Sequence, residues 1–234
     1  MSVTTNKKTL LVLGGSGTGK TFSLKELVMA EGEKITFIDI DGKNALPFRG
    51  KNKIHDWIVP TDPLTLVNNL QLLEDDPASE YIIVDTLSHW LRKLEQKYVV
   101  NSDDSRGAWG KVYQQALFEL LDFATSTSKK TWIFLSHTVE GDLENNQIPI
   151  KAFVKGSTKN VGIESFFQFV IYTNITNDDD EESLTGLKYR LQLSKTKDSK
   201  NLSVKTPEDF YPEPFLEEGG IKRVIELIEE YDND

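Results

Sequence analysis

The sequence predicts an α/β domain in which helices flank a mostly parallel central sheet. Three observations lead to this fold class. Strand-like and helical stretches alternate along the chain, which requires crossover connections between parallel strands. Several strand-like runs, such as Ile82–Val84 and Ile133–Leu135, are continuously apolar, as in strands buried on both faces. The 234 residues suit one large domain with a substantial core.

The elements are expected in the following order. Six strands are predicted, at Thr9–Leu13, Lys34–Ile40, Tyr81–Asp85, Thr131–Ser136, Phe166–Thr173 and Lys188–Ser194. Five helices are predicted, at Lys20–Ala30, Pro63–Glu74, Leu87–Val99, Trp109–Ser126 and Ile221–Glu230. The last two strands have no helix between them, which predicts an antiparallel hairpin at an edge of the sheet.

Two segments and the C-terminal stretch complete the expected organisation. Residues 101–107 and 138–162 are polar or weakly periodic and are expected to be functional loops. Residues 1–206 are assigned to the core, and 207–234 to a short acidic C-terminal helix and tail packed on it. Packing is expected because one face of that helix is apolar, formed by Ile221, Val224, Ile225 and Ile228.

Composition excludes several classes of protein. The chain has no cysteine, so it has neither a disulfide nor a thiolate metal site. No apolar run approaches the roughly 20 residues that span a bilayer, so no membrane partner is expected. The N-terminal residues lack the long apolar stretch of a signal peptide, and a cytoplasmic location is the simplest expectation.

Charge is distributed unevenly. The net charge of −10 argues at first against a nucleic-acid partner. Residues 207–234 hold ten acidic and two basic residues, a balance of −8, whereas residues 183–206 hold six basic residues and one acidic residue, a balance of +5. Each block can be solvated surface, but an acidic terminus beside a basic patch can also compete with DNA for that patch.

Residues 14–21 match the phosphate-binding pattern G-x-x-x-x-G-K-[ST]. The glycines let successive backbone N–H groups point into one concavity at the start of a helix, where an anion binds. Lys20 is expected to reach the β- and γ-phosphates, and the Thr21 hydroxyl to ligate Mg²⁺. ATP with Mg²⁺ is therefore expected to bind to Gly14, Gly15, Ser16, Gly17, Thr18, Gly19, Lys20 and Thr21.

Carboxylates follow two of the predicted strands. Asp85 ends the apolar run Tyr81–Val84 and is expected to face the Mg²⁺ beside Thr21. Asp39 and Asp41 share one face of another strand, and Asp41 lies further toward the edge where ligands bind. Asp41 is the candidate that orients or deprotonates the attacking water, although both residues also suit a turn before Gly42.

Polar residues also end the strand Thr131–Ser136. Ser136 or His137 could touch the γ-phosphate, and a structural role for the histidine stays open. The other two histidines, His55 and His89, have no partner at ligand spacing, and no role is assigned to them.

The arrangement resembles the RecA-type recombinase core over about residues 9–206. The family's strand Phe-Ile-Asp-x-acid matches residues 37–41, with Asp41 where bacterial RecA has Glu, and its magnesium strand matches residues 81–86. His137 occupies the place of the family's γ-phosphate sensor, a Gln. Lys195 and Lys197 match a Lys-x-Lys pair that, in RecA filaments, reaches the ATP of the neighbouring subunit.

The resemblance implies a catalytic set and a fold. The set is Asp41, Lys20, His137, Lys195 and Lys197, and the enzyme is a Mg²⁺-dependent ATP hydrolase with a RecA-like P-loop NTPase core. For the two distal lysines, an edge strand that discourages aggregation is the alternative reading.

The phosphate loop begins at residue 14 and only a short acidic helix follows the core, so the chain looks like the minimal RecA-core ATPases of phages. This implies a DNA-dependent ATPase that assembles on single-stranded DNA and promotes annealing or homologous recombination in a phage-infected bacterial cell. The expected partners are single-stranded DNA, further copies of the chain in a filament or ring, and a single-strand-binding protein. The candidate phosphate contacts for DNA are Arg106, Lys151, Lys155 and Lys159, with Phe153 as a candidate stacking residue.

Three alternatives stay open. A ring-forming motor or helicase loader uses the same core. A small-molecule kinase usually clusters several arginines around the phosphate, whereas the five arginines here are scattered. An accessory module that holds ATP without turning it over is compatible with Asp41 and His137 at their positions.

Overall fold

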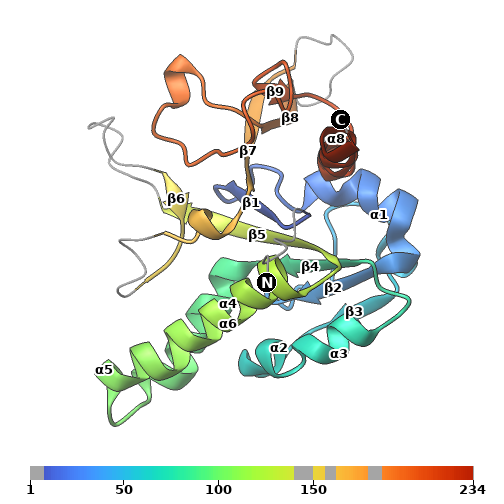
Figure 1. Cartoon of the computed structure of the whole chain (residues 1–234). Helices are drawn as coiled ribbons and strands as arrows, with labels where there is room; N and C mark the ends of the chain where they lie inside the picture. The colour runs from blue at the N-terminus through green and yellow to red at the C-terminus, as the bar shows by residue number, and fades with distance from the viewer. Residues whose placement is uncertain (1–7, 140–149, 156–161, 179–185, 234) are drawn as a thin grey trace.

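We describe the computed structural model of the chain for residues 8–139, 150–155, 162–178 and 186–233. In these segments, nine strands form a sheet in the order β3-β2-β4-β5-β1-β7-β8-β9, with β6 paired to β5 (Figure 1). The strand bounds are Leu10–Gly14 (β1), Ile35–Asp39 (β2), Asp56–Ile58 (β3), Tyr81–Asp85 (β4), Thr131–Val139 (β5), Lys151–Ala152 (β6), Phe169–Asn177 (β7), Leu187–Gln192 (β8) and Phe215–Leu216 (β9).

The sheet is parallel from β3 to β7 and antiparallel beyond it. The parallel neighbours are β3 with β2, β2 with β4, β4 with β5, β5 with β1, and β1 with β7. Strands β7 and β8 form the predicted antiparallel hairpin, and β9 extends it. The predicted fold class, a RecA-like α/β core with a mostly parallel sheet and an antiparallel edge hairpin, is confirmed.

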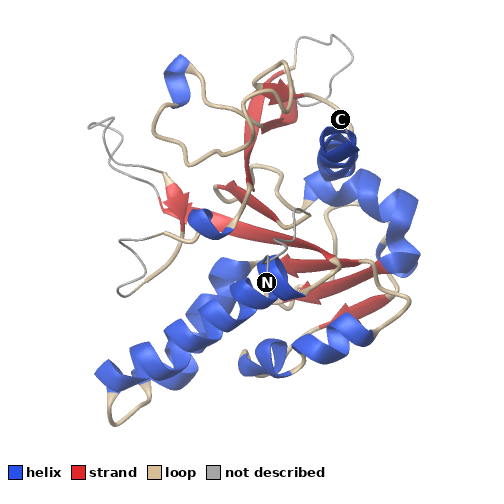
Figure 2. Ribbon diagram, viewed as in Figure 1, coloured by secondary structure: helices blue, strands red, loops and turns tan. Residues whose placement is uncertain are grey.

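Helices cover both faces of the sheet (Figure 2). Helices α1 (Lys25–Glu31) and α8 (Gly220–Asn233) pack against each other on one side. The other side carries α2 (Leu64–Asn68), α3 (Leu70–Asp75), α4 (Leu87–Leu94) and α6 (Gln115–Asp122). Each side has its own buried apolar cluster, because the side chains of the central strands alternate between the two faces.

The C-terminal helix uses the face that the sequence predicts. Ile221, Val224, Ile225 and Ile228 are all buried and belong to the same apolar cluster as Leu24, Leu27 and Val28 around α1. The acidic side chains of α8 remain toward the surface, where Glu226 and Glu230 pair with Arg223.

The prediction of a loop at residues 101–107 is largely wrong. A short turn leads into α5 (Ser105–Ala108), and the side chain of Asp104 caps this helix by accepting the Gly107 N–H at 2.9 Å. Helix α4 continues as a π-helical stretch over Glu95–Val100, and α5 continues as another over Trp109–Gln114 before α6. The result is a helical hairpin with α5 at its far end (Figure 1).

The expected loop at residues 138–162 is also more ordered at its start. Strand β5 runs on to Val139 and pairs with β6 through Thr138–Ala152 and Val139–Lys151. Residues 140–149 and 156–161 lie outside the described segments. Strands β3, β6 and β9 were not predicted, since each is only two or three residues long and carries no periodicity.

Candidate active site

The phosphate loop connects the end of β1 to a helical turn that begins at Phe22. Gly17 and Gly19 have φ angles of +77° and +92°, a region that L side chains rarely adopt. A Cβ atom on Gly19 would lie 2.5 Å from the ring of Tyr189, so glycine is required there for space as well as for backbone angle. The loop is fastened to the sheet by Thr18, whose hydroxyl lies 2.7 Å from that of Thr173 on β7.

Lys20 lies folded against this loop and is almost fully buried. Its Nζ donates to the carbonyl oxygens of Gly14 at 3.0 Å and Gly15 at 2.6 Å, and lies 3.3 Å from Nδ1 of His137. Desolvation lowers the pKa of Lys20 to about 8, against the opposing charges of Asp85 and Asp41. The ammonium therefore remains protonated at neutral pH, held where an anion would attract it.

Thr21 and Asp85 meet across the loop. The Thr21 hydroxyl donates to Oδ2 of Asp85 at 2.9 Å, and Asp85 ends β4 beside Asp39 of β2. Burial raises the pKa of Asp85 to about 6, which the hydrogen bond from Thr21 partly offsets. A carboxylate and a hydroxyl fit Mg²⁺, which takes one or two protein oxygens and completes its shell with water and phosphate. The described residues contain no group of three or more candidate metal-binding side chains, so the protein share of such a site is small.

Asp41 lies just beyond β2, with its side chain only 7% exposed. Its Oδ2 accepts from Lys43 Nζ at 2.8 Å, and its Oδ1 contacts Nδ1 of His89 and accepts from the Thr86 hydroxyl at 3.4 Å. Burial pushes the pKa of Asp41 up, but the hydrogen bonds from Lys43 and His89 outweigh it and hold that pKa below its usual value. The carboxylate is therefore ionised at neutral pH.

His137 follows the buried part of β5 and faces the loop. Its backbone N–H donates to the hydroxyl of Ser88 at 3.2 Å, and its ring lies 5.5 Å from that of His89. Desolvation, with the nearby charge of Lys20, lowers the pKa of His137 to about 4. The ring is neutral at physiological pH and acts as a hydrogen-bonding group.

One pocket of about 430 Å³ gathers these groups. It contains most of the predicted loop residues and also Asp41, Asp85 and His137, which come from the ends of three different strands. Parallel strands place their carboxyl ends at the same edge of the sheet, which explains why residues so far apart in sequence meet. The pocket is lined by Ser16, Gly17, Gly19, Lys20, Thr21, Phe22, Asp41, Lys43, Pro47, Asp85, Thr86, His137 and Tyr189.

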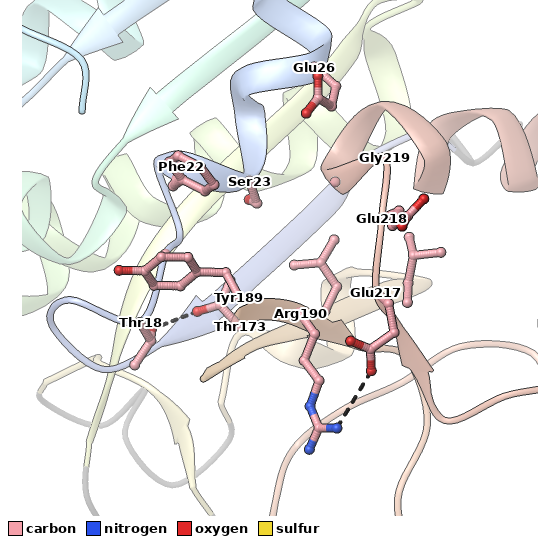
Figure 3. Close-up of a pocket in the computed structure, with 14 residues that line it drawn as sticks. Thr18, Phe22, Ser23, Glu26, Thr173, Tyr189, Arg190, Glu217, Glu218 and Gly219 are labelled. Carbon is pink, nitrogen blue, oxygen red and sulfur yellow. Dashed lines mark hydrogen bonds and ion pairs between the residues drawn. The ribbon is translucent and has the colours of Figure 1, made fainter. Parts of the chain in front are cut away.

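A second cavity, of about 370 Å³, adjoins the loop on the other side of Gly19 (Figure 3). Tyr189 and Phe22 lie side by side at its mouth, with ring centroids 5.3 Å apart. Leu191 and Leu216 add aliphatic surface, and Glu217 at the rim pairs with Arg190 at 3.6 Å. A flat, largely apolar group joined to a phosphate chain suits this combination of walls.

The remaining predicted residues lie elsewhere. Lys195 and Lys197 are exposed in the segment after β8 and are absent from the described lining of the phosphate pocket. Arg106 is in α5, at the far end of the helical hairpin. Lys151 is on β6, Lys155 pairs with Glu95 at 2.7 Å, and Lys159 lies outside the described residues.

Phe153 is anchored by cations. The guanidinium of Arg92 lies 4.8 Å from its ring centroid, and Nζ of Lys155 lies 5.8 Å from it. This places Phe153 against the helical hairpin, an environment that favours an anchoring role for the ring.

Sequence reasoning missed His89, Lys43 and Tyr189. His89 is four residues after Asp85 on α4, and only the adjacency of β2 and β4 brings it to Asp41. Tyr189 reaches the loop from β8 because the edge hairpin packs beside β1 through β7. A sequence signal for either would have required the strand order first.

Comparisons with known proteins add little to this geometry. No family model matches the chain, and no curated protein matches it. Among solved structures, a prototypical ATPase from the type III secretion system of pathogenic bacteria is similar, with a TM-score of 0.48 and 15% sequence identity. The match covers 78% of this chain and spans 56% of that ATPase chain. Within the described residues, no helix is both long and apolar enough to cross a membrane.

Proposed function

We propose that the protein is a Mg²⁺-dependent ATP hydrolase. The observation that carries this proposal is the single pocket in which a phosphate-binding loop, a buried lysine, the Thr21–Asp85 pair and the ionised Asp41 converge. Phosphoryl transfer needs little more than such positioning and charge neutralisation. The adjoining cavity behind Gly19 is the proposed site of the nucleotide base, against Tyr189 and Phe22.

In the proposed reaction, the oxygen of a water molecule forms a bond to the γ-phosphorus and the bond from that phosphorus to the bridging oxygen breaks. The ADP oxygen keeps the electron pair, and Asp41 accepts the proton that the water loses. Lys20 exchanges its contacts with the loop carbonyls for the β- and γ-phosphates, and the neutral His137 offers a hydrogen bond to the γ-phosphate. Mg²⁺ held by Thr21 and Asp85 would neutralise charge on the phosphate oxygens.

A comparison of products separates this activity from the kinase alternative. We expect the wild type to form ADP and inorganic phosphate in equal amounts without any added acceptor. The Lys20→Ala variant should lose both nucleotide binding and turnover. ADP that forms only when a small-molecule acceptor is added would replace the hydrolase with a kinase, and tight binding without turnover would indicate an accessory module.

We also propose that single-stranded DNA stimulates this activity. The support is a basic surface that two distant segments form together: Ile150, next to β6, exchanges backbone hydrogen bonds with Asn201 and Ser203 at 2.8 and 3.1 Å. This pairing places Lys151 in the same region as the exposed Lys195, Lys197 and Lys200. Binding of a labelled single-stranded oligonucleotide that weakens steeply between 50 and 200 mM salt is the expected result.

Assembly across subunits is a further part of the proposal. Lys195 and Lys197 are exposed and are absent from the described lining of their own phosphate pocket, which is compatible with their reaching the site of a neighbouring copy. Electron microscopy with ATP and DNA separates filaments from the closed rings of a motor or helicase loader. The role in annealing or recombination, the single-strand-binding partner and the phage origin rest on the resemblance to phage ATPases alone.

A further inference from the structure

The first turn of α4 holds both the candidate catalytic carboxylate and the candidate γ-phosphate contact. Thr86 caps this helix, and its hydroxyl accepts the backbone N–H of His89 at 3.4 Å. The Ser88 hydroxyl accepts the backbone N–H of His137, and the His89 ring contacts Asp41. One helical turn therefore connects the ends of β2 and β5 on either side of Asp85.

The contact between His89 and Asp41 defines which atom carries the proton. The pKa of Asp41 lies below its usual value, so the carboxylate is ionised and can only accept hydrogen bonds. Nδ1 of His89 must then carry the hydrogen that it donates to Oδ1 of Asp41. The neutral ring is sufficient for this contact, and no charge on His89 is required.

The two oxygens of Asp41 differ in how firmly they are held. Oδ1 receives its hydrogen bonds from His89 and Thr86, which belong to the start of a packed helix. Oδ2 is bound only to Lys43, among the described residues, and the side chain of Lys43 is 72% exposed. A surface lysine leaves such a contact at small cost, whereas the helix does not move. Oδ2 is therefore the oxygen that a water molecule can reach.

We propose that His89 is the positioning residue of Asp41: its Nδ1–H fixes Oδ1 so that Oδ2 is presented to the attacking water. The inference rests on the proposed hydrolase activity and adds a residue that no sequence pattern assigned. His89 acts through Asp41 and touches neither the nucleotide nor the reacting atoms. Its contribution should appear in kcat, with the affinity for ATP unchanged.

The kinetic test compares two substitutions with a matched control. His89→Leu removes the donor, and we expect kcat to fall about 10- to 100-fold while KM for ATP stays within about two-fold. His89→Asn places an amide N–H near the position of Nδ1 and should recover most of kcat. His55→Leu is the control, because His55 also pairs with an aspartate, Asp76 at 3.0 Å, on a surface distant from the loop.

A second measurement reads the contact without turnover. The ring nitrogen resonances of His89 should shift in Asp41→Asn, whereas those of His55 should not. Unchanged His89 resonances would overturn the inference, as would unchanged kcat in His89→Leu. Equal losses in His89→Leu and His89→Asn would overturn it too, since the role would then be structural.

The outcomes also separate this inference from the proposed function. If Asp41→Asn and Lys20→Ala lose turnover and His89→Leu does not, only the inference fails. If the wild type releases no phosphate from ATP under any condition, the hydrolase activity fails and the positioning role falls with it.

Discussion

Two aspartates at the same edge of the sheet are held in opposite electrostatic states. Burial raises the pKa of Asp85 to about 6, whereas Lys43 and His89 hold the pKa of Asp41 below its usual value. The first needs a cation to become fully ionised, and the second is ionised without one. This difference matches a division of work between a metal ligand and an acceptor of the water proton.

Replacement of Asp41 tests the second role. We expect Asp41→Asn to lower kcat by about 100-fold or more, because an amide cannot take up the proton, and to leave KM for ATP within about three-fold. Steady-state phosphate release over a range of ATP concentrations measures both constants. A variant with wild-type kcat would show that Asp41 is not the acceptor.

Asp85 predicts a trade between stability and function. The folded protein holds a proton on Asp85 between about pH 4 and 6 that the unfolded chain has already lost, so the free energy of unfolding falls as pH rises through that window. Asp85→Asn removes a buried charge and should stabilise the metal-free protein by about 1–2 kcal/mol at pH 7, and by much less at pH 4. The lost bond from Thr21 limits the gain.

Chemical denaturation in the presence of a chelator at the two pH values provides the check. The same variant should lose Mg²⁺-dependent turnover. A destabilised Asp85→Asn at pH 7 would mean that the hydrogen bond from Thr21 outweighs the cost of burying the charge.

At the scale of elements, the hairpin of β7 and β8 completes the nucleotide site. It delivers Thr173 to the loop and places Tyr189 over Gly19. Tyr189→Ala should raise KM for ATP about tenfold with kcat little changed, since stacking on a base contributes binding in the ground and transition states alike. Tyr189→Phe keeps the ring and should behave as the wild type. An equal effect of both substitutions would assign the role to the hydroxyl.

The regular elements of this fold are largely predictable, because period and burial mark them. The apolar runs at Ile82–Val84 and Ile133–Leu135 are central strands, and the loop, Asp85, Asp41 and His137 line one pocket. Short strands such as β9 carry no periodic signal, and the turn at residues 101–104 was mistaken for a longer loop because its polar residues cap a helix. His89 and Tyr189 depend on strand order, which the sequence alone does not encode locally.

At the scale of the whole molecule, the charge is divided between an acidic C-terminal stretch and a basic surface that includes Lys195 and Lys197. Paired replacement of these lysines by alanine should abolish any stimulation of turnover by single-stranded DNA and remove the rise of specific activity with protein concentration. Basal turnover in dilute solution should stay unchanged, because the lysines are absent from the described lining of their own pocket.

Two readouts distinguish the proposed roles of this pair. Loss of oligonucleotide binding with the concentration dependence intact assigns the lysines to the DNA surface. Loss of the concentration dependence with oligonucleotide binding intact assigns them to a neighbouring active site. No change in either would leave them as edge-strand residues that discourage aggregation.

The central claim is that the pocket around the phosphate loop hydrolyses ATP. The most direct measurement is phosphate release from ATP by the wild type with Mg²⁺, beside the same assay with a chelator and with Lys20→Ala. The structure predicts steady multiple turnover in the first assay and none above background in the other two. Phosphate release that persists in Lys20→Ala, or a wild type that binds ATP and never turns it over, would contradict the account.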